Sequence, residues 1–140
     1  MARLTTKAII DRQDLELLAE ARRREFAVLK SAGEYTGALY IGGYAIELLL
    51  KRAICTTLRL GRLPEIFHTH ELEALLFFSG LKADLDAVAS LKVEFNALNS
   101  LWSEERRYST ADAADPRDCA EMERWLFDPA GLYEWIRSKL

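Results

Sequence analysis

The pattern of hydrophobic and polar positions predicts that the chain begins with a long amphipathic helix over about residues 12–32. Apolar side chains recur on one side at helical spacing, and the run Arg22 to Arg24 falls largely on the remaining surface. Gly33 follows, where a left-handed backbone is easiest because glycine has no Cβ. The apolar positions are Leu15, Leu18, Ala19, Phe26 and Leu29. We therefore expect one face of this helix to pack against the rest of the chain.

The most informative predicted helix covers about residues 34–60, because it is apolar around most of its circumference. A helix of this kind is typically buried in a protein interior. Several of its residues are small, which lets neighbouring helices approach closely at some cost in helix propensity. These small residues are Gly37, Ala38, Gly42, Gly43 and Ala45. Glu47 and Lys51 are charged, four residues apart in the order that favours an ion pair, and Gly61 is expected to end the helix.

Two further helices are expected in the middle of the chain. A short one over about residues 71–79 follows a loop with Pro64, has Thr69 as its expected N-cap and ends at Gly80. A longer one over about residues 82–102 has the most regular pattern in the chain. Its apolar seam consists of Leu81, Leu85, Val88, Phe95, Leu98 and Trp102.

Two Asp-Pro pairs predict the starts of the last two helices. Asp115-Pro116 and Asp128-Pro129 each place an N-cap residue before a proline at the first helical position. They predict helices over about residues 116–127 and 129–140. No alternating run bounded by turn residues indicates a pair of strands. The expected fold class is therefore all-α.

Composition and charge narrow the class of protein. The chain has 140 residues, which suits one domain over residues 1–140, and its net charge of −3 argues against a positively charged coat for non-specific nucleic-acid binding. Cys55 and Cys119 lack further ligands at zinc spacing, so no metal and no cofactor is expected. Without an apolar leader or a stretch long enough to span a bilayer, we expect a cytoplasmic protein with no membrane contact.

Glu47 is the most unusual charged residue, because it lies within the most apolar predicted helix. An unpaired carboxylate in such a place would be unfavourable. One interpretation is a structural ion pair with Lys51, Arg52 or Arg107. The other is a polar group that lines a binding cleft between helices. We favour the ion pair, because structural ion networks are common around buried carboxylates.

The remaining polar residues offer fewer chemical possibilities. His68 and His70 precede the short helix, where a hydrogen bond to nearby backbone is a commoner role than metal binding. No serine or cysteine lies in a recognisable nucleophile motif. Arg107 and Tyr108 follow the 82–102 helix and could hold a phosphate and stack a base. A solvated helix end is an equally good interpretation of that segment.

Several of these segments occur in the order typical of a known helical family. The core of the pattern is the tyrosine-alanine-x-glutamate-x-x-x-lysine stretch from Tyr44 to Lys51, preceded by residues 34–40. It is followed by His70-Glu71-Leu72, Leu75-Leu76, Trp102 and Arg107-Tyr108. In this order the chain resembles, over most of its length, the HEPN domain, a helical family named for higher-eukaryote and prokaryote nucleotide binding.

The resemblance implies an up-and-down bundle of four main helices plus short helices, often a homodimer. It also implies a setting beside a small nucleotidyltransferase in a prokaryotic toxin–antitoxin or defence module. Many relatives are metal-independent ribonucleases, in which a histidine helps to deprotonate the RNA 2′-hydroxyl and a nearby arginine stabilises charge on the phosphate. Here Arg107 has no histidine after it, whereas Arg62 and His68 match the spacing in a loop that contains Pro64. We interpret that match as coincidental and assign no catalytic residue.

The leading hypothesis is therefore a HEPN-like, non-catalytic module that binds a nucleotide, a nucleic acid or a protein. Its expected ligand-binding residues are Glu47, Lys51, His70, Arg107 and Tyr108. One alternative is a ribonuclease that uses Arg62 and His68. Another is a purely structural, dimerising partner of a nucleotidyltransferase.

Overall fold

Helix α2, Tyr35–Thr57, is the central element of the fold. The computed structural model describes residues 10–102 and 116–140. Most α2 residues between Ala38 and Cys55 are buried, which confirms the prediction from a helix that is apolar on nearly all sides. The helix is slightly shorter than residues 34–60, because Arg59 adopts a left-handed backbone with φ of 56° before Gly61 is reached.

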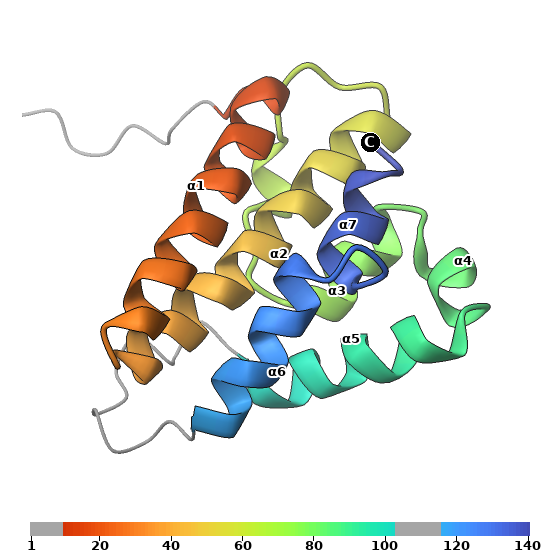
Figure 1. Cartoon of the computed structure of the whole chain (residues 1–140). Helices are drawn as coiled ribbons and strands as arrows, with labels where there is room; N and C mark the ends of the chain where they lie inside the picture. Colours follow the sequence, from red (N-terminus) through yellow and green to blue (C-terminus); the bar gives the residue numbers. More distant parts are fainter. Residues whose placement is uncertain (1–9, 103–115) are drawn as a thin grey trace, which may run out of the picture.

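Helix α1, Arg12–Ser31, packs along α2 to form a helical hairpin (Figure 1). Leu15, Ala19 and Phe26 of α1 have no exposed surface. Gly33 in the connecting turn has φ of 79°, the left-handed conformation expected of a residue just past a helix end. The first helix and its termination are thus confirmed, but the expected place of Leu18 on the packing face is wrong, because Leu18 is 39% exposed.

Two glycines of α2 lie where other side chains approach the helix most closely. A Cβ atom at Gly43 would lie 2.2 Å from Cδ1 of Trp102, and one at Gly42 would lie 2.8 Å from Cγ of Met122. At Gly37 the nearest atom would be 3.7 Å away, which is an ordinary contact. The predicted packing role is therefore confirmed for Gly42 and Gly43 but not for Gly37.

Residues 62–102 form four elements where two helices were predicted, and one of them, Leu72–Phe78, confirms the short helix predicted over about 71–79. These elements are the 3₁₀-helix η1, Glu65–Phe67, and the helices α3, Leu72–Phe78, α4, Lys82–Asp86, and α5, Ala89–Leu101. The continuous helix predicted over 82–102 is wrong, because Val88 has an extended backbone (φ −107°, ψ 102°) and divides it. Leu85 before the break and Leu91 after it are both buried, so both pieces keep their apolar side on the core.

The last two helices follow the predictions unevenly. Helix α6, Pro116–Phe127, matches its predicted range, whereas α7 covers only Leu132–Arg137. The expected N-cap Asp128 instead forms a turn in which its carboxylate accepts a hydrogen bond from the backbone N–H of Ala130 at 2.8 Å, and Gly131 is the N-cap. The N-cap prediction for Thr69 is wrong as well, because α3 begins after Glu71.

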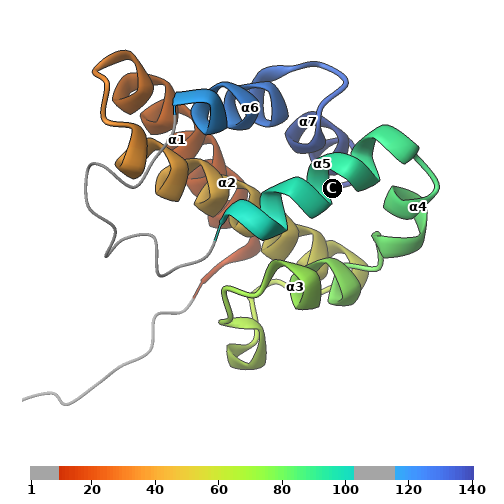
Figure 2. The same cartoon turned by 90° about the horizontal axis from the view of Figure 1, so that it is seen from below.

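The helices surround α2. Figures 1 and 2 show α1, α6 and α7 on one side of α2 and α3 on another, while α5 crosses below and meets α6 and α7. No strand forms in residues 10–102 or 116–140, so the all-α class is confirmed for them. The up-and-down arrangement of four main helices stays a prediction. None of the helices in these two ranges is both long and apolar enough to cross a bilayer.

Candidate functional site

The candidate site is built on Glu47, a carboxylate with no exposed surface in the middle of α2. Lys51, one turn further along α2 and 6% exposed, places its Nζ 2.9 Å from Glu47 Oε2. His70, in the loop before α3, places its Nδ1 2.8 Å from Glu47 Oε1. Each carboxylate oxygen therefore has one nitrogen partner.

The pairing explains how a charge is tolerated inside the core. An isolated buried carboxylate would be strongly unfavourable, but a cation and a second donor supply opposite charge and hydrogen bonds. Because an ionised carboxylate can only accept, His70 donates from Nδ1, which sets its tautomer and holds the imidazole in one orientation. Glu47 thus fixes a histidine that is itself partly exposed.

His70 connects this buried pair to a pocket on the surface. Its side chain is 37% exposed and lines a cavity of about 450 Å³. The cavity lies between the start of α3 and the end of α5, and its wall also contains Glu71, Leu72, Glu73, Asn99 and Trp102. A volume of this size suits a small organic molecule or one unit of a larger ligand.

Trp102, at the end of α5, closes one side of the pocket and is held rigidly. Its indole Nε1–H donates a hydrogen bond to the backbone oxygen of Tyr40 at 2.9 Å, and the missing side chain of Gly43 makes room for its ring. The rings of Trp102 and Tyr40 are stacked at 6.4 Å between centroids, and Tyr44 lies 6.1 Å beyond Tyr40. Three aromatic rings therefore extend from the pocket along α2.

The phenol of Tyr44 is affected by the neighbouring charges. Burial raises the pKa of Tyr44, and the charge of Glu47 and the nearby Tyr40 raise it further, while Arg22 opposes the rise. Tyr44 therefore stays neutral at physiological pH. Its hydroxyl remains a hydrogen-bond donor near the site.

The structure brings together three of the five residues predicted to bind a ligand. Glu47, Lys51 and His70 form one cluster, although only His70 reaches the pocket wall. Arg107 and Tyr108 lie outside the described residues. The interpretation of Glu47 as half of an ion pair with Lys51 is confirmed. For His70 the sequence predicted a hydrogen bond to nearby backbone and did not predict the hydrogen bond between its Nδ1 and Glu47.

The residues of the alternative ribonuclease interpretation, Arg62 and His68, both lie in the segment between α2 and α3. The backbone of Arg62 forms an isolated bridge with Asp11 before α1. His68 ends η1, and its Nε2 is buried without a hydrogen-bond partner among the described residues. No hydrogen bond or ion pair joins the two side chains there, so the geometry offers no support for a catalytic pair.

Sequence reasoning missed much of the pocket wall. Trp102 was recognised as an apolar seam residue and as part of the family pattern, but not as a wall of the site. Asn99 and Glu73 carry no signal in the sequence, because their proximity to His70 depends on how α3 and α5 meet. Only a three-dimensional arrangement brings them together.

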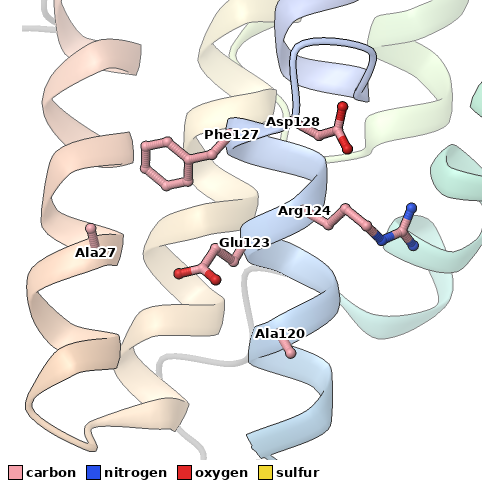
Figure 3. A pocket seen from close by; sticks show the side chains of 6 residues that line it. All are labelled: Ala27, Ala120, Glu123, Arg124, Phe127 and Asp128. Atoms are coloured by element: carbon pink, nitrogen blue, oxygen red, sulfur yellow. The ribbon is translucent and has the colours of Figure 1, made fainter.

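A different pocket, of about 560 Å³, lies between α1 and α6 (Figure 3). Glu123 points toward α1, and Arg124 points to the opposite side of α6. Glu123 pairs with Lys30 at 3.4 Å, and Arg124 pairs with Glu121. Since Glu123 and Arg124 diverge and are already paired, these two side chains form no convergent polar set in this pocket.

Neither a group of metal ligands nor a similar known protein adds to the description of this site. Within residues 10–102 and 116–140, no three histidine, cysteine, aspartate or glutamate side chains gather in a way that could hold a metal. No family model matches the sequence, and neither a curated protein nor a solved structure matches it. Membership of the HEPN family accordingly stays a prediction.

Proposed function

We propose that this chain is a HEPN-like, non-catalytic binding module whose pocket at His70 takes the base and ribose of a nucleotide or of single-stranded RNA. The observation that carries the proposal is the fixed imidazole of His70, which the buried Glu47–Lys51 pair holds in the wall of a pocket next to Trp102 and Asn99. A polar group held in advance loses less conformational freedom when a ligand binds.

The charges around the pocket favour the base and ribose over the phosphate. Glu71 and Glu73 line the wall and would repel an anion, and the ammonium group of Lys51 is already paired. Carboxylate and amide side chains such as these pair well with amino groups on base edges and with ribose hydroxyls. The phosphate of a bound nucleotide would therefore point away from this pocket.

The aromatic rings next to the pocket favour a ligand with flat bases. Trp102, Tyr40 and Tyr44 follow one another along α2, and Tyr40 and Tyr44 are only partly buried. Successive bases of single-stranded RNA stack on aromatic side chains with little dependence on sequence. A short RNA segment thus has a stacking surface that starts at the pocket.

The biological setting that we propose follows from the family resemblance. It is an up-and-down helical bundle that forms a homodimer beside a small nucleotidyltransferase in a toxin–antitoxin or defence pair. In that setting the chain acts by binding, with no catalytic residue of its own.

The proposal is tested by titrating the protein with adenosine 5′-monophosphate and with a short single-stranded RNA. Binding is followed by tryptophan fluorescence and by amide NMR shifts, and we expect His70→Ala to weaken both ligands about tenfold, the effect of losing one well-placed hydrogen bond. His68→Ala is the matched control, because His68 lies two residues away but outside the pocket wall. It should bind like the wild type.

Two results would contradict the proposal. One is equal affinity of His70→Ala and the wild type for both ligands while circular dichroism shows an intact fold. The other is cleavage of the RNA in the presence of a chelator by the wild type but not by His68→Ala, which would favour the ribonuclease alternative.

A further inference from the structure

A third pocket lies on another side of α2, where this helix faces α1 and α7. Its volume is about 690 Å³, and it shares no lining residue with the pocket at His70. Arginine side chains reach it from three helices: Arg23 from α1, Arg52 from α2 and Arg137 from α7. The other lining residues are Gln13, Glu16, Leu17 and Glu20. The wall therefore carries three guanidinium groups and only two carboxylates.

Two of the three arginines are paired within the protein. Arg23 Nη2 lies 3.1 Å from Glu20 Oε2, and its Nη1 lies 2.9 Å from Glu134 Oε1. Arg137 Nε lies 3.5 Å from Glu20 Oε1 and 3.9 Å from Glu16 Oε2. Both carboxylates of the pocket wall are thus engaged, and neither pairs with the third arginine.

Arg52 is a partly buried guanidinium without an ion pair in the described part of the chain. Its Nη1 donates a hydrogen bond to the hydroxyl of Thr56, and its Nε is buried without an acceptor among the described residues. A guanidinium group keeps its charge at any ordinary pH. A charge that is partly removed from water and has no counter-charge is unfavourable, so an anion at this position would stabilise it.

Arg12 adds positive charge at the same end of α2. The backbone N–H of Arg12 donates a hydrogen bond to the backbone oxygen of Gly61 at 2.9 Å, which places Arg12 just beyond the C-terminal end of α2. Burial raises the pKa of the Cys55 thiol, and the charges of Arg52 and Arg12 oppose that rise. Arg12 has no ion pair within residues 10–102 and 116–140 either. Two guanidinium groups without carboxylate partners therefore act on this region.

We infer that Arg52, together with Gln13 in the same wall, binds the phosphate group of a small molecule. The planar guanidinium group presents parallel donors that match two phosphate oxygens, and the amide of Gln13 offers a neutral donor. The cavity is larger than a phosphate ion and leaves room for the group that carries it. This site is separate from the proposed nucleotide pocket and does not depend on it.

The test is an NMR titration of the protein with inorganic phosphate and with pyrophosphate at constant ionic strength, maintained with sodium chloride. The Nε–H signal of Arg52 and nearby amide signals report binding. We expect saturable shifts that chloride alone does not produce, and about tenfold weaker binding in Arg52→Gln, since a charge-assisted bond is lost. The matched control is Arg24→Gln, because Arg24 also lacks an ion pair in the described residues but is exposed on α1. It should bind like the wild type.

The outcomes separate this site from the proposed nucleotide pocket. The His70→Ala variant should bind inorganic phosphate as tightly as the wild type does. A loss of nucleotide binding in this variant would therefore not change the affinity for phosphate at Arg52. If Arg52→Gln does not fold, the position of the shifts in the wild type decides: shifts centred on Arg52 and Gln13 support the site. Shifts spread over exposed arginines, equal binding by a folded Arg52→Gln, or the absence of saturation would overturn it.

Discussion

Glu47 is buried in α2 with a nitrogen partner on each carboxylate oxygen, Lys51 from its own helix and His70 from the loop before α3. Its burial and its pairing with Lys51 follow from an apolar helix and a four-residue spacing, and both are confirmed. His70, the second partner, belongs to a different segment, and no local pattern relates the two residues. Arg52 was an equally good candidate for the ion pair with Glu47 from the sequence. It lies about 100° further round the helix than Lys51, however, and lines the pocket between α1, α2 and α7.

Glu94 is a second buried carboxylate, and the sequence contains no sign of it because it falls among ordinary polar residues of α5. Glu94 is 8% exposed, and its Oε1 accepts a hydrogen bond from the backbone N–H of Leu132 at 3.1 Å. Burial raises the pKa of Glu94 above its ordinary value. The bond from Leu132 and the charge of Arg124 oppose this rise only in part, and Asp128 adds to it. Glu94 thus joins α5 to the start of α7 at some electrostatic cost.

This raised pKa gives a pH-dependent stability with a definite sign. Below the ordinary glutamate pKa of about 4.3 the group is protonated in both folded and unfolded chains. As pH rises from there through the higher pKa of the folded state, the unfolded chain releases its proton first, so the free energy of unfolding decreases. Glu94→Gln should remove this decrease and raise the free energy of unfolding at pH 7 by on the order of 1 kcal/mol, because the glutamine oxygen still accepts from Leu132.

Urea denaturation of both proteins at several pH values between 4 and 7 measures this effect. Glu25→Gln is a suitable control, because the Glu25 side chain is 47% exposed and, among the residues that the structure describes, pairs only with Arg22 across one helical turn. Its effect should stay below about 0.5 kcal/mol, with the pH dependence of the wild type unchanged. A Glu94→Gln protein that is less stable than the wild type at pH 7 would show that the ion pair with Arg124 outweighs burial.

At the scale of an element, the sequence predicts the bounds of α1, α2, α3 and α6 closely but misses the division between α4 and α5 and the late start of α7. The start of α6 follows from local chemistry, because Pro116 stands at the first helical position. The break at Val88 does not, because the apolar spacing continues across it and both Leu85 before it and Leu91 after it are buried. The late start of α7 has a similar cause: a turn closed by Asp128 uses the same Asp-Pro signal as a helix N-cap.

The close packing of Trp102 against Gly43 of α2 can be tested by substitution. Gly43→Ala should place a methyl group 2.2 Å from the present position of Trp102 Cδ1. The indole is 4% exposed and hydrogen-bonded to Tyr40, so it cannot move away without losing that bond. We expect the free energy of unfolding to fall by about 1–3 kcal/mol, the usual effect of overpacking, despite the better helix propensity of alanine.

Gly37→Ala in the same helix is the matched control. Its new methyl group would meet only Leu29 at 3.7 Å, so the gain in helix propensity should appear as unchanged or higher stability, by up to about 1 kcal/mol. Urea denaturation followed by circular dichroism compares the two variants. Equal effects of the two substitutions would mean that Trp102 does not pack against Gly43 as described.

At the scale of the whole molecule, the sequence identifies which segments are helical but not how they meet. The amphipathic pattern of each helix predicts that its apolar face packs against another element. The pattern does not identify which element that is. The meeting of α3 with α5, which forms the pocket at His70, depends on loops whose conformations are set by positions such as Val88 and Gly80. The fold class was therefore predictable, whereas the pocket walls were not.

The prediction of one domain can be tested because one hydrophobic core includes residues of every helix from α1 to α7. Leu15 of α1, Leu98 of α5 and Ile136 of α7 all have no exposed surface in this core. Elements that share a core lose their packing together, so we expect a single cooperative unfolding transition with a free energy of about 5–15 kcal/mol.

Far-ultraviolet circular dichroism reports all helices, including the α1–α2 hairpin. Fluorescence reports Trp102, Trp125 and Trp135, which lie at the end of α5 and in α6 and α7. The two midpoints in urea should coincide. A fluorescence transition that precedes the loss of helix would mean that α5 to α7 unfold separately from the hairpin, and the pocket at His70 would then belong to a unit less stable than the helix that supports it.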